Sequence, residues 1–221
     1  MAWFCSGRTN SELVENLKKE GIITSPRVVL AMKSVDRAHF VSKQPYEDSP
    51  QYIGYGATIS APHMHGYALE SLASFLQPGM TALDVGSGSG YLTACMAAMV
   101  GDGGRVVGID HIPELVRASE NALLRHYSDW IENSRVKMVA GDGRNGYVAD
   151  APYDCIHVGA ASPTKPKNLL AQLKTPGRMF VPVGTDEQHI LVYDKDANGV
   201  VTEQRVMGVN YIPLTDPSKQ L

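Results

Sequence analysis

The sequence lacks the features that define several common classes of protein. Its 221 residues include only three cysteines, and no pair has the spacing of a zinc-binding motif. No run reaches the about 18 consecutive apolar residues of a membrane-spanning helix, and the N-terminus lacks the apolar run and cleavage site of a signal peptide. The formal net charge of −3 lacks the basic excess typical of nucleic-acid-binding proteins. We therefore expect a cytoplasmic protein that binds neither membranes nor nucleic acid.

The composition nevertheless supports a substantial core. Hydrophobic residues make up 43% of the chain and charged residues 19%, which is typical of globular proteins. Near the N-terminus, Thr9 and Glu12 form a capping-box pattern that predicts a helix over residues 10–20. A second helix is predicted from Pro26, and the proline- and glycine-containing stretch 43–56 is predicted to be irregular.

From residue 81 onwards, predicted strands alternate with predicted helices. Repeated strand–helix units predict an α/β fold, in which a doubly wound, mostly parallel sheet carries helices on both faces. Asn198-Gly199 predicts a hairpin turn, so the last two strands should form an antiparallel C-terminal edge. The predicted strands are 81–85, 106–110, 136–140, 153–158, 179–183, 190–193 and 200–209, and the helices between the first three are 91–100 and 113–127.

Three glycines at alternate positions, Gly86, Gly88 and Gly90, follow the first of these strands and precede a helix. Glycine has no Cβ, so a ligand can approach such a turn closely, and the helix N-terminus offers N–H groups to a ligand carboxylate. Asp110 ends the next strand, close to the spacing of about 20 residues at which a carboxylate binds ribose hydroxyls. Asp110 could instead cap the helix that begins at Pro113.

The residues around the turn distinguish between two adenosine cofactors. The glycine spacing differs from the Gly-x-Gly-x-x-Gly of dinucleotide-binding proteins, and Asp84 would repel a pyrophosphate. S-adenosylmethionine carries an ammonium and a sulfonium group and no phosphate, so Asp84 favours this cofactor. Asp142 and Gly143 follow the third strand and could contact its adenine, although an Asp-Gly pair is equally typical of a plain turn.

The segment Ala57-Thr58-Ile59-Ser60-Ala61-Pro62-His63-Met64-His65 resembles the signature of protein L-isoaspartyl (D-aspartyl) O-methyltransferases. Further matches cover nearly the whole chain, at residues 49–51, 83–93, 108–111, 141–144, 153–161, 173–184 and 209–216. The resemblance implies a Rossmann-like fold with extra N-terminal helices. It also implies repair of damaged proteins and peptides: a methyl group moves from S-adenosylmethionine to the free α-carboxylate of an L-isoaspartyl residue or the side-chain carboxylate of a D-aspartyl residue. S-adenosyl-L-homocysteine is the other product, and the ester cyclises to a succinimide.

The resemblance assigns roles to individual residues. It makes Ser60 the active-site residue, whereas Gly66 and the pair Tyr55-Gly56 depart from the usual family pattern. The cofactor contacts that it implies, together with Asp84, are Ala57, Thr58, Ile59, Ser60, His65, Val85, Gly86, Ser87, Gly88, Ser89, Asp110, His111, Asp142, Gly143, Thr215 and Gln220.

The domain organisation follows from the same assignments. We expect a single methyltransferase domain over residues 1–221, with an N-terminal helical part (1–78), a cofactor-binding core (79–184) and a C-terminal hairpin and extension (185–221). No long heptad pattern indicates a coiled coil, so we expect a monomer.

The chemistry explains why no base–nucleophile pair stands out in the sequence. An α-carboxyl group has a pKa of about 3.3–3.7, so the nucleophile is already ionised at neutral pH. We expect Ser60 to orient this carboxylate, although a serine before Pro62 could also cap a helix. His63 and His65 have no third partner, so we expect no metal site. The substrate chain could pair with the edge strand 200–209.

Three other interpretations remain open at this point. A methyltransferase for another substrate would share the glycine turn but not the segment around Ser60. An NAD-dependent oxidoreductase would require a different glycine spacing. A binding module without activity could keep the same fold.

Overall fold

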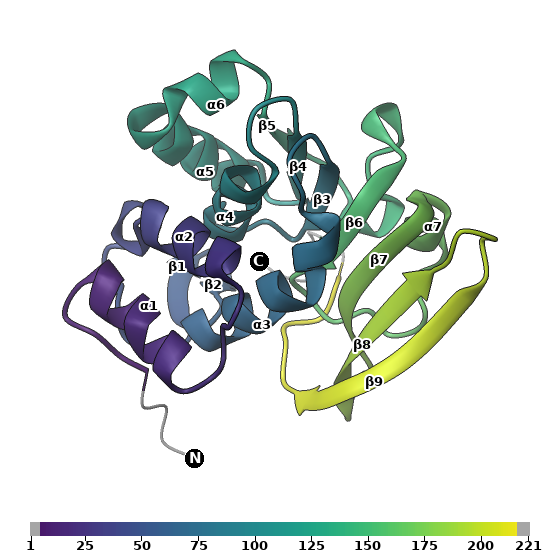
Figure 1. The fold of residues 1–221 in the computed structure, drawn as a ribbon, viewed down its shortest axis with the longest axis horizontal. Helices are drawn as coiled ribbons and strands as arrows, with labels where there is room; N and C mark the ends of the chain where they lie inside the picture. The colour runs from purple at the N-terminus through teal and green to yellow at the C-terminus, as the bar shows by residue number, and fades with distance from the viewer. Residues whose placement is uncertain (1–4, 216–221) are drawn as a thin grey trace.

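The computed structural model describes residues 5–215. Its central sheet has seven strands in the order β5-β4-β3-β6-β7-β8-β9 (Figure 1). Strands β5, β4, β3, β6 and β7 run parallel, and β8 and β9 are antiparallel additions at one edge. The predicted doubly wound sheet with an antiparallel edge is therefore confirmed. The strands are β3 (Thr81–Val85), β4 (Arg105–Asp110), β5 (Val136–Ala140), β6 (Tyr153–Val158), β7 (Leu173–Val183), β8 (Gln188–Lys195) and β9 (Val201–Val209).

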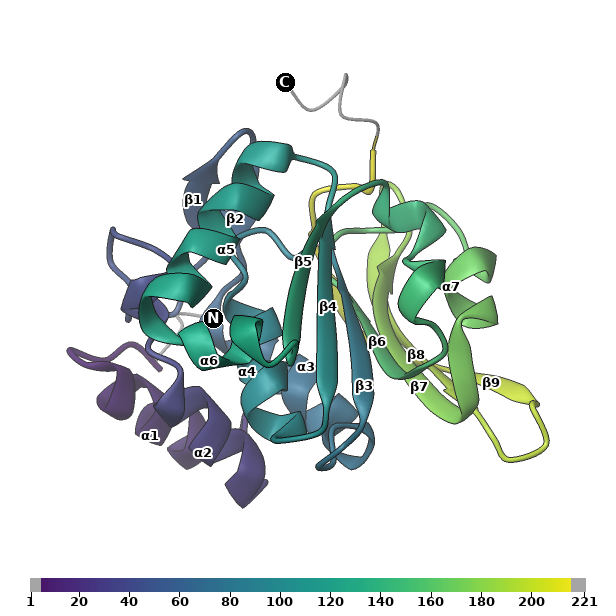
Figure 2. The ribbon, with the colours of Figure 1, turned by 90° about the horizontal axis from the view of Figure 1, so that it is seen from above.

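Helices cover both faces of the sheet because side chains alternate between its two sides. Along β3, Ala82 packs into the hydrophobic cluster shared with α4 (Tyr91–Val100), while Leu83 and Val85 pack into the cluster shared with α7 (Lys167–Ala171). Figure 2 shows α4 and α5 (Pro113–His126) on one side of the sheet and α7 on the other. The short helices α6 (Ser128–Glu132) and α7 were not predicted.

The N-terminal part adds three helices beside α4. They are α1 (Asn10–Lys19), α2 (Pro26–Ser34) and α3 (Pro62–Leu72), and short 3₁₀ helices lie at Arg37–His39, Ala73–Phe75, Gly143–Asn145 and Val148–Asp150. The predicted cap of α1 is present, since the Thr9 hydroxyl accepts the N–H of Glu12 at 3.2 Å. Within residues 5–215, no helix is long and apolar enough to cross a membrane.

A two-stranded hairpin, β1 (Gln51–Gly54) and β2 (Ala57–Ile59), lies between α2 and α3. The prediction of an irregular stretch over 43–56 is wrong for its last part, which forms β1. The prolines before this four-residue strand and the glycines at its end hide it in the sequence. The glycines form its tight turn, where Gly54, Tyr55 and Gly56 have φ values of 98°, 53° and 68°. The hairpin matters because it leads directly into the loop that carries Ser60.

Candidate active site

A cavity of about 430 Å³ opens at the carboxyl ends of the parallel strands. Strand order reverses between β3 and β6, and ligands of open α/β sheets bind in the crevice at such a point. The loops after β3, β4, β5 and β6 contribute to its walls, as do the β2–α3 loop and the segment after β9. The cavity is lined by Pro50, Ala57, Thr58, Ser60, Ala61, His63, Met64, Gly86, Gly88, Ile109, Asp110, His111, Gly143, Gly159, Ala160 and residues 208–214.

The glycine turn is held against the end of β4 by Asp110. The N–H of Gly88 donates to Asp110 Oδ2 at 2.9 Å, and the N–H of Ile112 donates to Oδ1 at 3.0 Å. Burial raises the pKa of Asp110, while these two backbone hydrogen bonds act in the opposite direction. Asp110 is not the cap of α5, since Ile112 occupies the N-cap position and no side chain caps the helix there; Asp110 lines the cavity, and its contact with a ribose stays a prediction. Each carboxylate oxygen keeps a further lone pair for a hydroxyl donor.

A glycine is required at position 88 for two reasons. Its φ of 50° lies in the left-handed region, which residues with a Cβ rarely adopt. A Cβ there would also lie 3.3 Å from Ile53 Cδ1, in the hairpin on the other side of the turn. The turn and the hairpin therefore approach closely at the cavity.

Asp84 does not line the cavity, because the alternation along β3 directs its carboxylate into the core. The carboxylate is 1% exposed. Its Oδ2 accepts the Thr93 hydroxyl of α4 at 2.6 Å, and its Oδ1 lies 2.8 Å from Nδ1 of His157 in β6. Asp84 thus joins β3 to the helix that follows the glycine turn.

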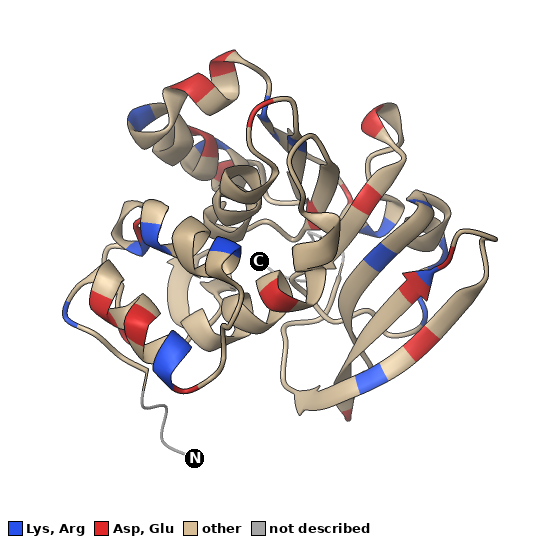
Figure 3. Ribbon diagram, in the orientation of Figure 1, with Lys and Arg blue, Asp and Glu red and all other residues tan. Residues whose placement is uncertain are grey.

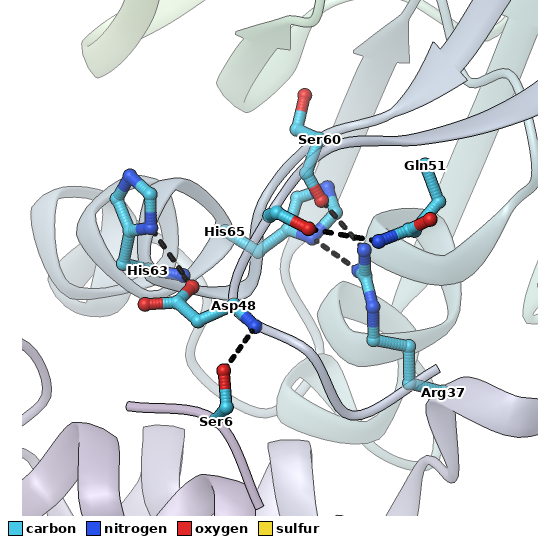
Figure 4. A network of polar contacts seen from close by, with 8 residues as sticks. Ser6, Arg37, Asp48, Gln51, Ser60, His63 and His65 are labelled. Atoms are coloured by element: carbon cyan, nitrogen blue, oxygen red, sulfur yellow. Dashed lines mark hydrogen bonds and ion pairs between the residues drawn. The ribbon is translucent and has the colours of Figure 1, made fainter. Parts of the chain in front are cut away.

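The loop that carries Ser60 is anchored by a buried arginine. Arg37 is fully buried, and its Nη2 donates to the Ser60 carbonyl oxygen at 2.8 Å (Figure 4). Its Nη1 lies 3.2 Å from Nδ1 of His65. Burial lowers the Arg37 pKa to about 10, so the guanidinium stays charged at neutral pH. Burial and the nearby Arg37 charge hold the His65 pKa well below its ordinary value, so His65 is neutral and accepts this hydrogen bond.

The Ser60 side chain points away from this network (Figure 4). Ala61, rather than Ser60, occupies the N-cap position of α3, and no side chain caps the helix there. The alternative role of Ser60 as a helix cap is therefore absent. Ser60 lines the cavity, and so does Tyr211. Burial raises the Tyr211 pKa to about 12, while the neighbouring Ser60 acts in the opposite direction.

His63 and Tyr211 lie beside Ser60 in the cavity wall, and the sequence did not single out either as a site residue. The ring Nδ1 and the backbone N–H of His63 both contact Asp48 Oδ1, at 2.8 and 2.9 Å, and both residues are buried. The backbone of Tyr211 is held by Gln188, whose Oε1 accepts its N–H at 2.5 Å and whose Nε2 donates to its C=O at 3.0 Å. The side chain of His63 and the backbone of Tyr211 are thus fixed from behind the cavity wall.

The structure brings about half of the predicted site residues to the cavity. Those that line it are Ala57, Thr58, Ser60, Gly86, Gly88, Asp110, His111 and Gly143. Ile59, His65, Asp84 and Val85 are buried behind the walls, and Ser87, Ser89, Asp142 and Thr215 are not among the lining residues. The carboxylate of Asp142 is bound by Arg144, which lowers its pKa. Gln220 lies outside the described residues.

The main omission from the predicted site is the segment 208–214. Its residues are uncharged, so residue type gives no signal of a role, although 209–216 was among the segments that match the family. The chain reaches the cavity because Ala161 binds it: the Ala161 N–H donates to the Ile212 carbonyl oxygen, and the Leu214 N–H to the Ala161 carbonyl oxygen, both at 2.8 Å. Gly159 and Ala160 of the same β6 loop were missed for the same reason.

The buried Asp84 network yields a test of stability. Thr93→Val keeps the shape of the side chain but removes the donor to Asp84 Oδ2. Because the buried Asp84 carboxylate then lacks one hydrogen-bond donor, the free energy of unfolding should fall by about 1–3 kcal/mol. Urea denaturation measures this change, with Thr202→Val on the exposed side of β9 as the matched control. Equal stabilities of the two variants would contradict a structural role for the Asp84–Thr93 contact.

Comparison with known proteins identifies the family. The model of the protein-L-isoaspartate(D-aspartate) O-methyltransferase family matches residues 8–219. The protein-L-isoaspartate O-methyltransferase of Caenorhabditis elegans is 51% identical over 221 residues, covering 100% of this chain and 98% of that protein. The enzyme of the same name from Triticum aestivum is 53% identical over 215 residues, covering 96% and 94%.

A solved structure agrees with these sequence matches. The Plasmodium falciparum protein described as a protein-L-isoaspartate O-methyltransferase, in complex with S-adenosyl-L-homocysteine, superposes with a TM-score of 0.87. It is 32% identical in sequence, and the match covers 95% of this chain and 99% of that one. With the sheet, the glycine turn and the Ser60 loop in place, this chain belongs to the protein-L-isoaspartate(D-aspartate) O-methyltransferase family.

Proposed function

We infer that this chain is a protein-repair enzyme that transfers a methyl group from S-adenosylmethionine to misplaced carboxylates in damaged proteins and peptides. The acceptors are the free α-carboxylate of L-isoaspartyl residues and the side-chain carboxylate of D-aspartyl residues. The observation that carries this inference is that one cavity is lined both by the glycine turn with Asp110 and by the Ser60 loop of the family signature. A donor and an acceptor can therefore meet there.

The residues of the cavity fit S-adenosylmethionine. The Asp110 carboxylate has lone pairs for the ribose hydroxyls, and no phosphate-binding lysine or arginine is among the lining residues. Gly86 and Gly88 of the turn line the cavity just before the N-terminus of α4, an end of a helix that suits the carboxylate of the methionine part. Gly143 lines the wall expected for the adenine. When bound, S-adenosylmethionine supplies an electrophilic methyl group on a positively charged sulfur.

The cavity walls also suit a carboxylate nucleophile. Among the described lining residues there is no lysine or arginine, so a bound carboxylate would not lose nucleophilicity to an ion pair. The carboxylate is ionised at neutral pH and needs no general base. A site with few water molecules favours this reaction, because two opposite charges disappear along its path. The lining residues Ala61, Met64 and Ile109 provide such an apolar surface.

Ser60 is proposed to orient the acceptor. Because Arg37 fixes the Ser60 carbonyl, the hydroxyl on the opposite side is held within the cavity and can donate to a carboxylate oxygen. The role is one of alignment, which raises the rate by restricting the approach geometry.

We also propose that the chain acts as a cytoplasmic monomer, forms a single domain and binds no nucleic acid. The positions of basic residues and of acidic residues are interspersed along the ribbon (Figure 3), and the formal net charge is −3. Strand β9 pairs only with β8 within residues 5–215, so its outer edge is available to pair with a substrate chain.

A pair of peptides tests the proposed function directly. One peptide contains an L-isoaspartyl residue, and its twin contains normal aspartate at the same position. The enzyme should methylate the first and not the second, because only the isoaspartyl residue presents a free α-carboxylate at that position within the chain. Transfer of labelled methyl from S-adenosylmethionine measures the reaction. Equal labelling of both peptides, or of neither, would exclude the proposed function.

Ser60→Ala tests the alignment role. Loss of one hydrogen bond to a charged group should lower kcat by about 10- to 100-fold. The affinity of Ser60→Ala for S-adenosyl-L-homocysteine, measured by calorimetry, should stay close to that of the parent enzyme. The control Ser42→Ala changes an exposed serine and should keep the activity of the parent enzyme. If Ser60→Ala instead lost cofactor affinity and kept its kcat, the serine would belong to the cofactor site alone.

Asp110→Asn tests the cofactor contact. The amide keeps one acceptor oxygen but loses the charge, so affinity for S-adenosyl-L-homocysteine should fall by about 10- to 100-fold. Isothermal titration measures the affinity, and thermal unfolding checks that the variant is folded. The control Asp102→Asn changes a side chain that is 95% exposed and distant from the cavity lining, and it should bind normally. Undiminished affinity in Asp110→Asn would show that the ribose lies elsewhere.

A further inference from the structure

The β1–β2 hairpin places an exposed aromatic ring at the edge of the cavity. Tyr52 is directly opposite Thr58 in the hairpin register, and opposed residues in an antiparallel pair point to the same face. Thr58 lines the cavity, whereas the other face of the hairpin carries the buried Ile59. Tyr52 therefore shares the face of Thr58, beside the cavity wall and outside its lining, and the residue is 70% exposed.

The backbone beneath Tyr52 is well supported. Ile53 packs against the hydrophobic core and approaches Gly88 of the glycine turn. Gln51 is partly buried, and its Nε2 donates to the Ser49 hydroxyl at 2.8 Å. An aromatic side chain on such a rigid hairpin has few rotamers to lose when it makes a contact. The ring is thus a preformed surface beside the entrance.

A second apolar side chain lies on another wall of the same cavity. Ile212 is 37% exposed, and its segment is fixed by the paired backbone hydrogen bonds with Ala161. The hairpin, residues 51–59, contains no charged residue, as its uncoloured ribbon shows (Figure 3). The surroundings of the entrance therefore favour an uncharged, apolar neighbour over a charged one.

The substrate itself is the molecule that must pass this surface. This step rests on the proposed function. A carboxylate that reaches Ser60 belongs to a residue within a polypeptide, and the Cα atom of the preceding residue is only about 3.8 Å away. On the other side the chain of an isoaspartyl residue continues through the side-chain carbonyl, which lengthens the link by one methylene group. They must leave the cavity across its edge, where Tyr52 lies. We propose that Tyr52 is a substrate-docking residue that contacts an aromatic or apolar side chain next to the damaged residue.

Two isoaspartyl peptides that differ only in the residue next to the isoaspartyl group test the proposal. One carries tyrosine there and the other carries serine. The comparison is made once with this residue before the isoaspartyl group and once, in a second pair of peptides, with it after the group. An aromatic contact should favour the tyrosine peptide in kcat/KM by about 3- to 10-fold, mainly through KM. Tyr52→Ser should bring this ratio close to one. Tyr52→Phe should keep it, because the ring makes the contact.

Val200→Ser is the matched control. Val200 is 57% exposed and precedes β9 in the turn after β8, which lies far from β1 and β2 in both views (Figures 1 and 2). This variant should keep the ratio of the parent enzyme. A parent ratio of one at both positions, or an unchanged ratio in Tyr52→Ser, would overturn the docking role and leave the proposed function intact. If the parent enzyme methylated none of the isoaspartyl peptides, both the docking role and the proposed function would be overturned.

Discussion

The hydrogen bond between the Gly88 N–H and the Asp110 carboxylate is the contact on which the site depends. Strands β3 and β4 are parallel and in register, with Val85 opposite Ile109, so both end at the same level. The carbonyl oxygen of Ile109 then accepts the N–H groups of Gly86 and Ser87, at 2.8 and 3.1 Å, and Asp110 accepts that of Gly88. Consecutive N–H groups of the turn are thereby fixed before any ligand binds. The result is a preorganised surface beside a carboxylate.

The acceptor side of the cavity is built by a different device. Its anchor is the buried charge of Arg37, which has no carboxylate partner at hydrogen-bond distance within residues 5–215 and is shared between the Ser60 carbonyl oxygen and neutral His65. Hydrogen bonds to a buried charge are among the stronger ones in proteins, so this loop is held firmly. The N-terminal helices therefore do more than cover α4. The short 3₁₀ helix after α2 carries Arg37, which fixes the position of the Ser60 loop relative to the glycine turn.

Much of the fold and one half of the site could be predicted from the sequence because their signals are local. The glycines of the turn and the acid that ends β4 stand next to apolar strands, and the βα alternation predicted the sheet. The burial of the Asp84 side chain away from the cavity could not be predicted in the same way. Its direction depends on which face of β3 it occupies and on partners in α4 and β6. Arg37 gave no signal either, since arginine is rarely fully buried. The wall formed by residues 208–214 consists of uncharged residues that reach the cavity only through Gln188 and Ala161.

The central claim is that the glycine turn and the Ser60 loop enclose one reaction space for a methyl donor and a carboxylate. A crystal structure of the protein with S-adenosyl-L-homocysteine and an isoaspartyl peptide tests it most directly. We predict that the ribose hydroxyls contact Asp110, that the sulfur faces the Ser60 loop, and that the isoaspartyl carboxylate lies between them. A sulfur atom directed away from Ser60, or a peptide carboxylate bound outside this cavity, would contradict the account.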